Sequence, residues 1–146
     1  MRILESEITI RGTPDQVWSV LTDFARYAEW NPFIRQASGE ATSGTRLRVK
    51  IHPPDARPMT FTPTIQQAVP ARELRWVGHL WLPRLFDGEH SFRIDRAADG
   101  HVRFRQDECF RGILVPLLPS AVYERTQRGF EAMNRALKER VEHLDA

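Results

Sequence analysis

Between residues 85 and 111, apolar and polar side chains alternate with a period of two, as is typical of β-strands that expose one face to solvent. Even-numbered positions are mostly apolar, whereas odd-numbered positions of the second half are mostly charged. Asp99-Gly100 separates the two halves, and a three-residue loop with Gly100 left-handed pairs Ala97 with His101. The pattern therefore predicts a β-hairpin with a largely apolar inner face.

Three polar residues interrupt that apolar face: His90, Gln106 and Glu108. The predicted register places His90 directly opposite Glu108. Cross-strand partners lie about 4.5–5.5 Å apart at Cβ, so an imidazole and a carboxylate there can form a hydrogen bond. We interpret the three residues as the polar part of a pocket, with His90 and Glu108 as the catalytic pair if the protein is an enzyme. A purely structural role, in which the two side chains only satisfy each other, is the alternative.

The remaining pattern predicts a strand, two short helices, a series of antiparallel strands and one long helix. Thr13-Pro14-Asp15-Gln16 has the form of a helical capping box, and a shorter helical segment follows over residues 25–29. Strands then run from residue 33 to 111 as a meander, and Pro63 indicates a strand edge or a bulge.

The C-terminal segment predicts an amphipathic helix from an N-cap at Ser120 to Leu144, about 36 Å long at about 1.5 Å per residue. Gly129 interrupts it, at a cost of about 1 kcal/mol relative to alanine. The glycine allows either close packing of the helix on the sheet or space for a ligand. The apolar stripe of the helix comprises Val122, Tyr123, Thr126, Phe130, Met133, Leu137, Val141 and Leu144.

Composition indicates an ordinary globular protein, and we expect one domain over residues 1–146. The chain is 41% hydrophobic and 27% charged, with a net charge of +2. Basic and acidic residues are interspersed, which argues against nucleic-acid binding. A single cysteine excludes an internal disulfide framework. Apolar runs are too short for a signal peptide or for membrane insertion, so we expect a cytoplasmic protein.

Motifs for a metal or a cofactor are missing from the sequence. The five histidines are scattered without the spacing of metal ligands. The chain also has no phosphate-binding loop, no dinucleotide fingerprint and no nucleophile motif. We therefore expect no metal and no cofactor.

Several segments together resemble the SRPBCC or START-like superfamily, and within it the bacterial polyketide cyclase/dehydrase-like branch. They are the Asp23, Tyr27 and Trp30-Asn31-Pro32 segment, Leu74-Arg75-Trp76, residues 88–92 and residues 106–112. The resemblance implies an α+β helix-grip fold. In that fold a curved antiparallel β-sheet wraps around a long C-terminal helix, two short helices follow the first strand, and an apolar cavity lies between helix and sheet.

The resemblance and the alternation together select candidate ligand contacts, some of which are equally well explained as core residues. Tyr27 and Trp30 either gate the cavity or join the short helices to the sheet. Trp81 and its loop form either an entrance lid or a partner contact, and residues 113–119 form a buried connection closing one end of the cavity. The predicted ligand-binding residues are Trp76, His90, Phe92, Phe104, Gln106, Glu108, Phe110, Met133, Gly129, Tyr27 and Trp30.

Two classes of function follow from this reading. The first is binding or carriage of a hydrophobic small molecule that is lipid-, polyketide- or quinone-like. The second is a cofactor-independent cyclase or dehydratase acting on a polyketide-like substrate, with His90 and Glu108 as the acid/base pair. A protein-interaction module is a further alternative. The sequence also allows the protein to form a homodimer.

Overall fold

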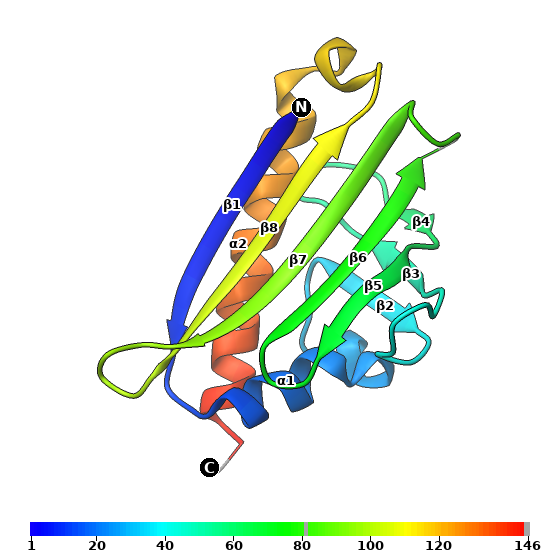
Figure 1. Ribbon diagram of the computed structural model, residues 1–146. Coiled ribbons are helices and arrows are strands. Elements are labelled where there is room, and N and C mark those ends of the chain that lie inside the picture. The colour runs from blue at the N-terminus through cyan, green and yellow to red at the C-terminus, as the bar shows by residue number, and fades with distance from the viewer. Residues whose placement is uncertain (81, 145–146) are drawn as a thin grey trace.

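The computed structural model describes residues 1–80 and 82–144 (Figure 1). A five-stranded antiparallel sheet, in the order β1-β8-β7-β6-β5, curves over the long helix α2 (Ser120–Glu142). This arrangement is the predicted α+β helix-grip fold. The strands of this sheet are β1 (Arg2–Ile10), β5 (Thr64–Val69), β6 (Glu73–Leu80), β7 (Phe86–Arg96) and β8 (Val102–Arg111).

A second, three-stranded sheet separates from the first, so the predicted meander is not continuous. Pro63 lies between β4 and β5, where its missing N–H ends the ladder, and the two sheets meet at an isolated bridge between Arg46 and Thr64. The strand edge expected at Pro63 is therefore confirmed. The strands of the second sheet are β2 (Ile34–Ser38), β3 (Arg48–Ile51) and β4 (Met59–Phe61).

The two short helices after β1 form as the sequence predicts. Helix α1 (Pro14–Thr22) begins with a complete capping box, in which Thr13 and Gln16 each accept a hydrogen bond from the other's backbone N–H. A 3₁₀ helix, η1 (Phe24–Glu29), follows it. In Figure 1 these helices lie across one end of the sheet.

The hairpin of β7 and β8 has the predicted loop and register. Gly100 has a φ of +85°, and the Ala97 N–H donates to the His101 carbonyl over 2.7 Å. Consequently His90 pairs with Glu108 across the two strands.

Both ends of helix α2 differ from prediction. Pro119, in extended conformation, is the N-cap, and Ser120 is the first helical residue. Proline suits this position because its φ is locked near the value observed, −60°, and it has no N–H to leave unpaired. Leu144 lies beyond the end of the helix and is 47% exposed, so it does not extend the buried stripe.

Glu142 connects the end of α2 to the segment after β1, and this contact makes stability depend on pH. Its Oε2 accepts from the Arg11 N–H over 2.9 Å and from Lys138 Nζ over 2.6 Å. The Arg11 backbone hydrogen bond, followed by that from Lys138, lowers the pKa of Glu142 below its usual 4.5. A depressed pKa in the folded state stabilises the fold above pH 4.5, and that stabilisation disappears as pH falls through the folded-state value.

Replacing Glu142 with glutamine is expected to lower the free energy of unfolding by about 0.5–1 kcal/mol at about pH 7. The loss should shrink at about pH 3, below the unfolded-state value of 4.5, because the unfolded chain then gains a proton that the folded carboxylate resists. Urea unfolding at the two pH values measures both effects. Glu139→Gln, on the exposed side of the same helix, is the matched control. An equal loss at both pH values would contradict the prediction.

Candidate functional site

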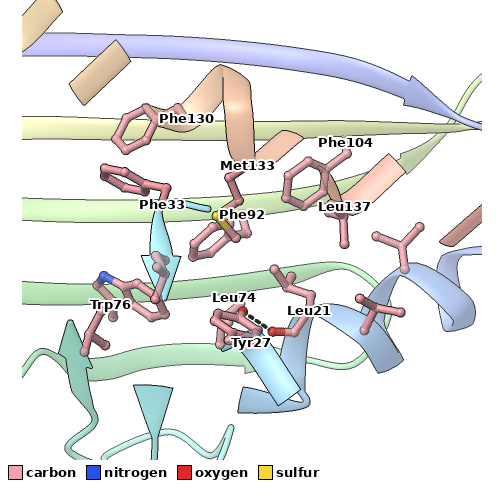
Figure 2. Packing of buried hydrophobic residues seen from close by; sticks show 14 of the residues in the cluster. Leu21, Tyr27, Phe33, Leu74, Trp76, Phe92, Phe104, Phe130, Met133 and Leu137 are labelled. Atoms are coloured by element: carbon pink, nitrogen blue, oxygen red, sulfur yellow. Dashed lines mark hydrogen bonds between the residues drawn. The ribbon is translucent and has the colours of Figure 1, made fainter. Parts of the chain in front are cut away.

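A cavity of about 310 Å³ lies between the sheet and the N-terminal half of α2, within the size range of ligand sites. The solid part of the core fills the other half, where α2 brings Met133 and Leu137 onto the sheet near α1 (Figure 2). The cavity is lined by Phe33, Ile34, Ile51, Met59, Phe61, Trp76, Gly78, His79, Leu80, Phe86, Gly88, His90, Glu108, Phe110, Leu118, Val122, Thr126 and Phe130.

Aromatic side chains form much of the cavity wall. Phe33 and Phe130 pack edge to face with their ring centroids 5.6 Å apart. Phe86 and Phe110 stack with centroids 5.3 Å apart. Such walls offer apolar area and flat faces to a ligand, but few hydrogen bonds.

The most buried ionisable side chains of the wall are His90 and Glu108, which form a pair; His79, which is more exposed, and Thr126 also line the cavity. His90 Nδ1 lies 2.9 Å from Glu108 Oε2, so the predicted hydrogen bond is present. The His90 side chain is 5% exposed and that of Glu108 is 16% exposed. Gly88, opposite Phe110 on the neighbouring strand, leaves room for the carboxylate, because a Cβ at residue 88 would lie 3.1 Å from Oε1.

A buried chain of hydrogen bonds continues from His90 away from the cavity. His90 Nε2 lies 2.9 Å from Gln106 Oε1, and Gln106 Nε2 donates to Asn134 Oδ1 over 2.8 Å. Asn134 Nδ2 donates to Ser6 Oγ over 2.9 Å, and Ser6 in turn donates to the Gln106 carbonyl over 2.9 Å. His90, Gln106 and Asn134 are each less than 5% exposed, so these bonds satisfy groups that water does not reach.

Asn134 and Ser6 are parts of this chain that the sequence analysis did not identify. Asn134 follows Phe130 by four residues and precedes Leu137 by three, so it lies on the apolar stripe of α2. A polar side chain on a buried helical face is the signal that could have revealed it. Ser6 pairs with Gln106 across β1 and β8, a pairing that follows only from the order of the strands in the sheet.

Aromatic rings enclose the imidazole of His90. Phe92 stacks on it with centroids 4.3 Å apart, and Phe130 and Trp76 lie at 4.9 and 5.4 Å. The ring therefore has little freedom to rotate away from Glu108 and Gln106.

Four of the eleven predicted ligand-binding residues line the cavity: Trp76, His90, Glu108 and Phe110. The other seven do not, although most have the predicted inward orientation. For Phe92, Phe104, Gln106 and Met133 the reason is position along the strands and along α2, because residues nearer to α1 are covered by closely packed side chains (Figure 2). These seven residues are Phe92, Phe104, Gln106, Met133, Gly129, Tyr27 and Trp30.

Tyr27 and Trp30 pack at the end of the core where the short helices meet the sheet. Tyr27 is fully buried, and its hydroxyl donates to the Leu21 carbonyl. Burial, together with the nearby Asp23 carboxylate, raises the pKa of Tyr27 well above its usual range. Its ring packs edge to face on Trp30 with centroids 5.2 Å apart. These contacts join η1 to the core, which was the alternative to a gating role.

Gly129 allows close packing of α2 against Phe33. A Cβ at residue 129 would lie well inside contact distance of the Phe33 ring, which Figure 2 shows beside Phe130. The space that a side chain at residue 129 would need is therefore filled by the Phe33 ring. Phe33 also lines the cavity.

Gly129→Ala is expected to destabilise the protein by up to about 2 kcal/mol. Overpacking costs about 1–3 kcal/mol and exceeds the gain of about 1 kcal/mol from alanine in a helix. Thermal or urea unfolding measures the change. In a Phe33→Leu background the same substitution should cost much less, because the displaced ring is gone. Equal costs in the two backgrounds would show that Phe33 is not the reason for the glycine.

The two loops at the cavity end of the sheet expose apolar side chains. The Ile113 and Leu114 N–H groups donate to the carbonyls of Arg84 and Leu85 over 3.1 and 3.0 Å, which holds the loops together. Leu82, Ile113 and Leu117 are 65%, 68% and 73% exposed. Trp81, predicted as a lid or a partner contact, lies outside the described residues.

The prediction that residues 113–119 form a buried connection is therefore largely wrong. Val115 is buried and Leu118 lines the cavity, whereas Ile113 and Leu117 face outward. The segment contains the 3₁₀ helix η2 (Val115–Leu117), whose side chains project in three directions, so that one neighbouring surface cannot cover them all.

In the part of the chain that the structure describes, no helix combines the length and the apolar character needed to cross a membrane. Over the same residues, no three His, Cys, Asp or Glu side chains come together in a way that could hold a metal ion.

Comparison with known proteins agrees with this architecture. A START superfamily protein of Mycobacterium smegmatis superimposes with a TM-score of 0.77 at 17% identity, covering 97% of this chain and 98% of the other. The Zhui aromatase/cyclase of Streptomyces sp. R1128 superimposes with a TM-score of 0.74 at 19% identity, covering 99% and 96%. At these identities the similarity establishes the fold alone.

Sequence comparison gives the family. No curated protein is significantly similar to the chain. A family model described as polyketide cyclase / dehydrase and lipid transport matches residues 1–142, nearly the whole sequence. The chain therefore belongs to the polyketide cyclase/dehydrase and lipid transport family.

Proposed function

We propose that the protein binds a hydrophobic small molecule, of lipid-, polyketide- or quinone-like character, in the cavity between α2 and the sheet. The observation that carries this proposal is the composition of the wall, in which aromatic and aliphatic side chains surround the pair of His90 and Glu108. Burial of apolar ligand surface supplies about 25 cal/mol per Å², and one polar pair is enough to orient the ligand.

A cofactor-independent cyclase or dehydratase is the second candidate function. It is favoured by the 2.9 Å contact between His90 and Glu108, because an imidazole and a carboxylate that share a proton at a cavity wall can act as a general acid and base. Binding ranks first because it needs only the apolar enclosure and one orienting group. Proton transfer needs in addition a substrate whose reacting atom reaches the pair.

Native mass spectrometry of the protein purified from its own host tests the proposal. We expect a population carrying an additional mass in the range of a small molecule, and organic extraction should release an apolar compound. Calorimetry with naphthalene, a small flat hydrocarbon, provides an independent measurement on emptied protein. If no molecule co-purifies and naphthalene does not bind, the cavity is not a binding site for apolar ligands.

A further inference from the structure

The buried hydrogen-bond chain has only one consistent direction. It ends on the backbone carbonyl of Gln106, which can only accept, so Ser6 Oγ must donate to it. Ser6 then accepts from the amide nitrogen of Asn134, whose Oδ1 accepts from Gln106. The carbonyl of Phe130 lies 3.5 Å from Gln106 Nε2 and supports the same orientation of the Gln106 amide. If that amide were flipped, its oxygen would face the Phe130 carbonyl oxygen.

This direction determines which nitrogen of His90 carries a hydrogen. Gln106 presents its oxygen to the imidazole, so His90 Nε2 must donate. In the neutral ring, Nδ1 is therefore the unprotonated nitrogen. A hydrogen bond between Nδ1 and Glu108 Oε2 then needs one proton between them, carried either by the imidazolium or by the carboxylic acid.

In both of these forms the second oxygen of Glu108 is an acceptor. With His90 protonated, Oε1 belongs to a carboxylate. With the proton on Oε2, Oε1 is the carbonyl oxygen of the acid. Among the described residues, Glu108 pairs with His90 through Oε2, whereas its Oε1 lies beside Gly88, which lines the cavity.

The hydroxyl oxygen of Thr126 is a second atom of the wall that can only accept a hydrogen bond from a ligand. Thr126 lines the cavity, and its hydroxyl hydrogen is donated to the Val122 carbonyl over 2.9 Å, within α2. Its oxygen can therefore accept from a ligand but has no hydrogen left to give.

We propose that the ligand carries a hydroxyl or N–H group, an alcohol or phenol being the simplest case, and donates it to Glu108 Oε1. This inference rests on the proposed binding function and specifies its ligand class. An ether or ketone accepts only. It therefore leaves Glu108 Oε1 without a partner. A ligand carboxylate would place its own negative charge beside the acceptor oxygens of Glu108, which disfavours binding.

Naphthalene and three of its derivatives of similar size test the proposal by calorimetry at about pH 7. 2-Naphthol should bind roughly 10- to 150-fold more tightly than 2-methoxynaphthalene, the range expected for a hydrogen bond to a charged group. Naphthalene should resemble the methyl ether, and 2-naphthoate should bind least. In Glu108→Met, which removes the acceptor and keeps the length of the side chain, the preference for 2-naphthol should disappear.

The outcomes separate this inference from the proposed function. Equal affinities for 2-naphthol, its methyl ether and naphthalene would overturn the inference and leave apolar binding intact. Failure of all four to bind would overturn the inference, and the proposed function as well if no molecule co-purifies with the protein. A ¹H–¹⁵N NMR correlation of the His90 ring gives a measurement that does not depend on a ligand or on the Glu108 variant. It should show hydrogen on Nε2, and a neutral ring with hydrogen on Nδ1 alone would overturn the inference.

Discussion

Glu108→Gln is expected to lower the affinity for the co-purified ligand by about 1–3 kcal/mol, the scale of one charged hydrogen bond. The loss is bounded because glutamine has the shape of glutamate, can still bond His90 Nδ1 through its amide, and leaves the apolar wall unchanged. Calorimetry with the extracted ligand measures the affinity. Glu89→Gln is the matched control, because Glu89 occupies the same strand pair, opposite Cys109, and forms its ion pair with Arg75.

The same variant separates binding from catalysis. If the pair of His90 and Glu108 transfers a proton, turnover of the extracted compound should fall by roughly 10²–10⁴-fold while binding is nearly intact. That result would favour the cyclase or dehydratase alternative. If Glu108→Gln and His90→Ala each leave binding and turnover unchanged, the pair has only the structural role that the sequence also allowed.

Thr126→Phe is expected to weaken ligand binding by at least roughly 100-fold, or about 3 kcal/mol, by occupying the cavity. Thr126 lies on α2 one turn from both Val122 and Phe130, and all three residues line the cavity. A phenyl ring there adds apolar volume where the ligand would lie, so the folded protein should lose little stability. Calorimetry with naphthalene measures the loss, and native mass spectrometry should show that the co-purified mass is gone.

Thr126→Val is the matched control for this prediction. Valine keeps the branched shape of threonine and removes only the hydroxyl group, so naphthalene should bind with nearly wild-type affinity. A thermal unfolding scan of both variants checks that the fold is retained. Unchanged naphthalene affinity in Thr126→Phe would show that the molecule binds elsewhere on the protein.

The local features of this fold were predictable because their causes are local in the chain. The register that brings His90 to Glu108 follows from a period of two and from the preference of Gly100 for a left-handed turn conformation. The capping box at Thr13 likewise depends on residues three positions apart. Resemblance to a family added the way in which the helix lies on the sheet.

The position of the cavity was decided by tertiary structure alone. His90 and Phe92 have the same alternation on one strand, yet one lines the cavity and the other is covered. What separates them is how closely α2 and Phe33 approach the sheet at each point. That distance depends on side chains far apart in sequence, such as Phe33 against Gly129, and no short-range pattern contains it.

The same division holds for the polar chain behind the cavity. That His90, Gln106 and Glu108 share the inner face was predictable from the residue pattern, because alternation along two strands joined by a short turn is enough for that. Only the tertiary structure brought in Asn134 and Ser6, whose hydrogen bond joins residues 128 positions apart. A hydrogen bond needs its donor and acceptor within about 3 Å, and across such a separation only the packing of α2 on β1 and β8 sets that distance.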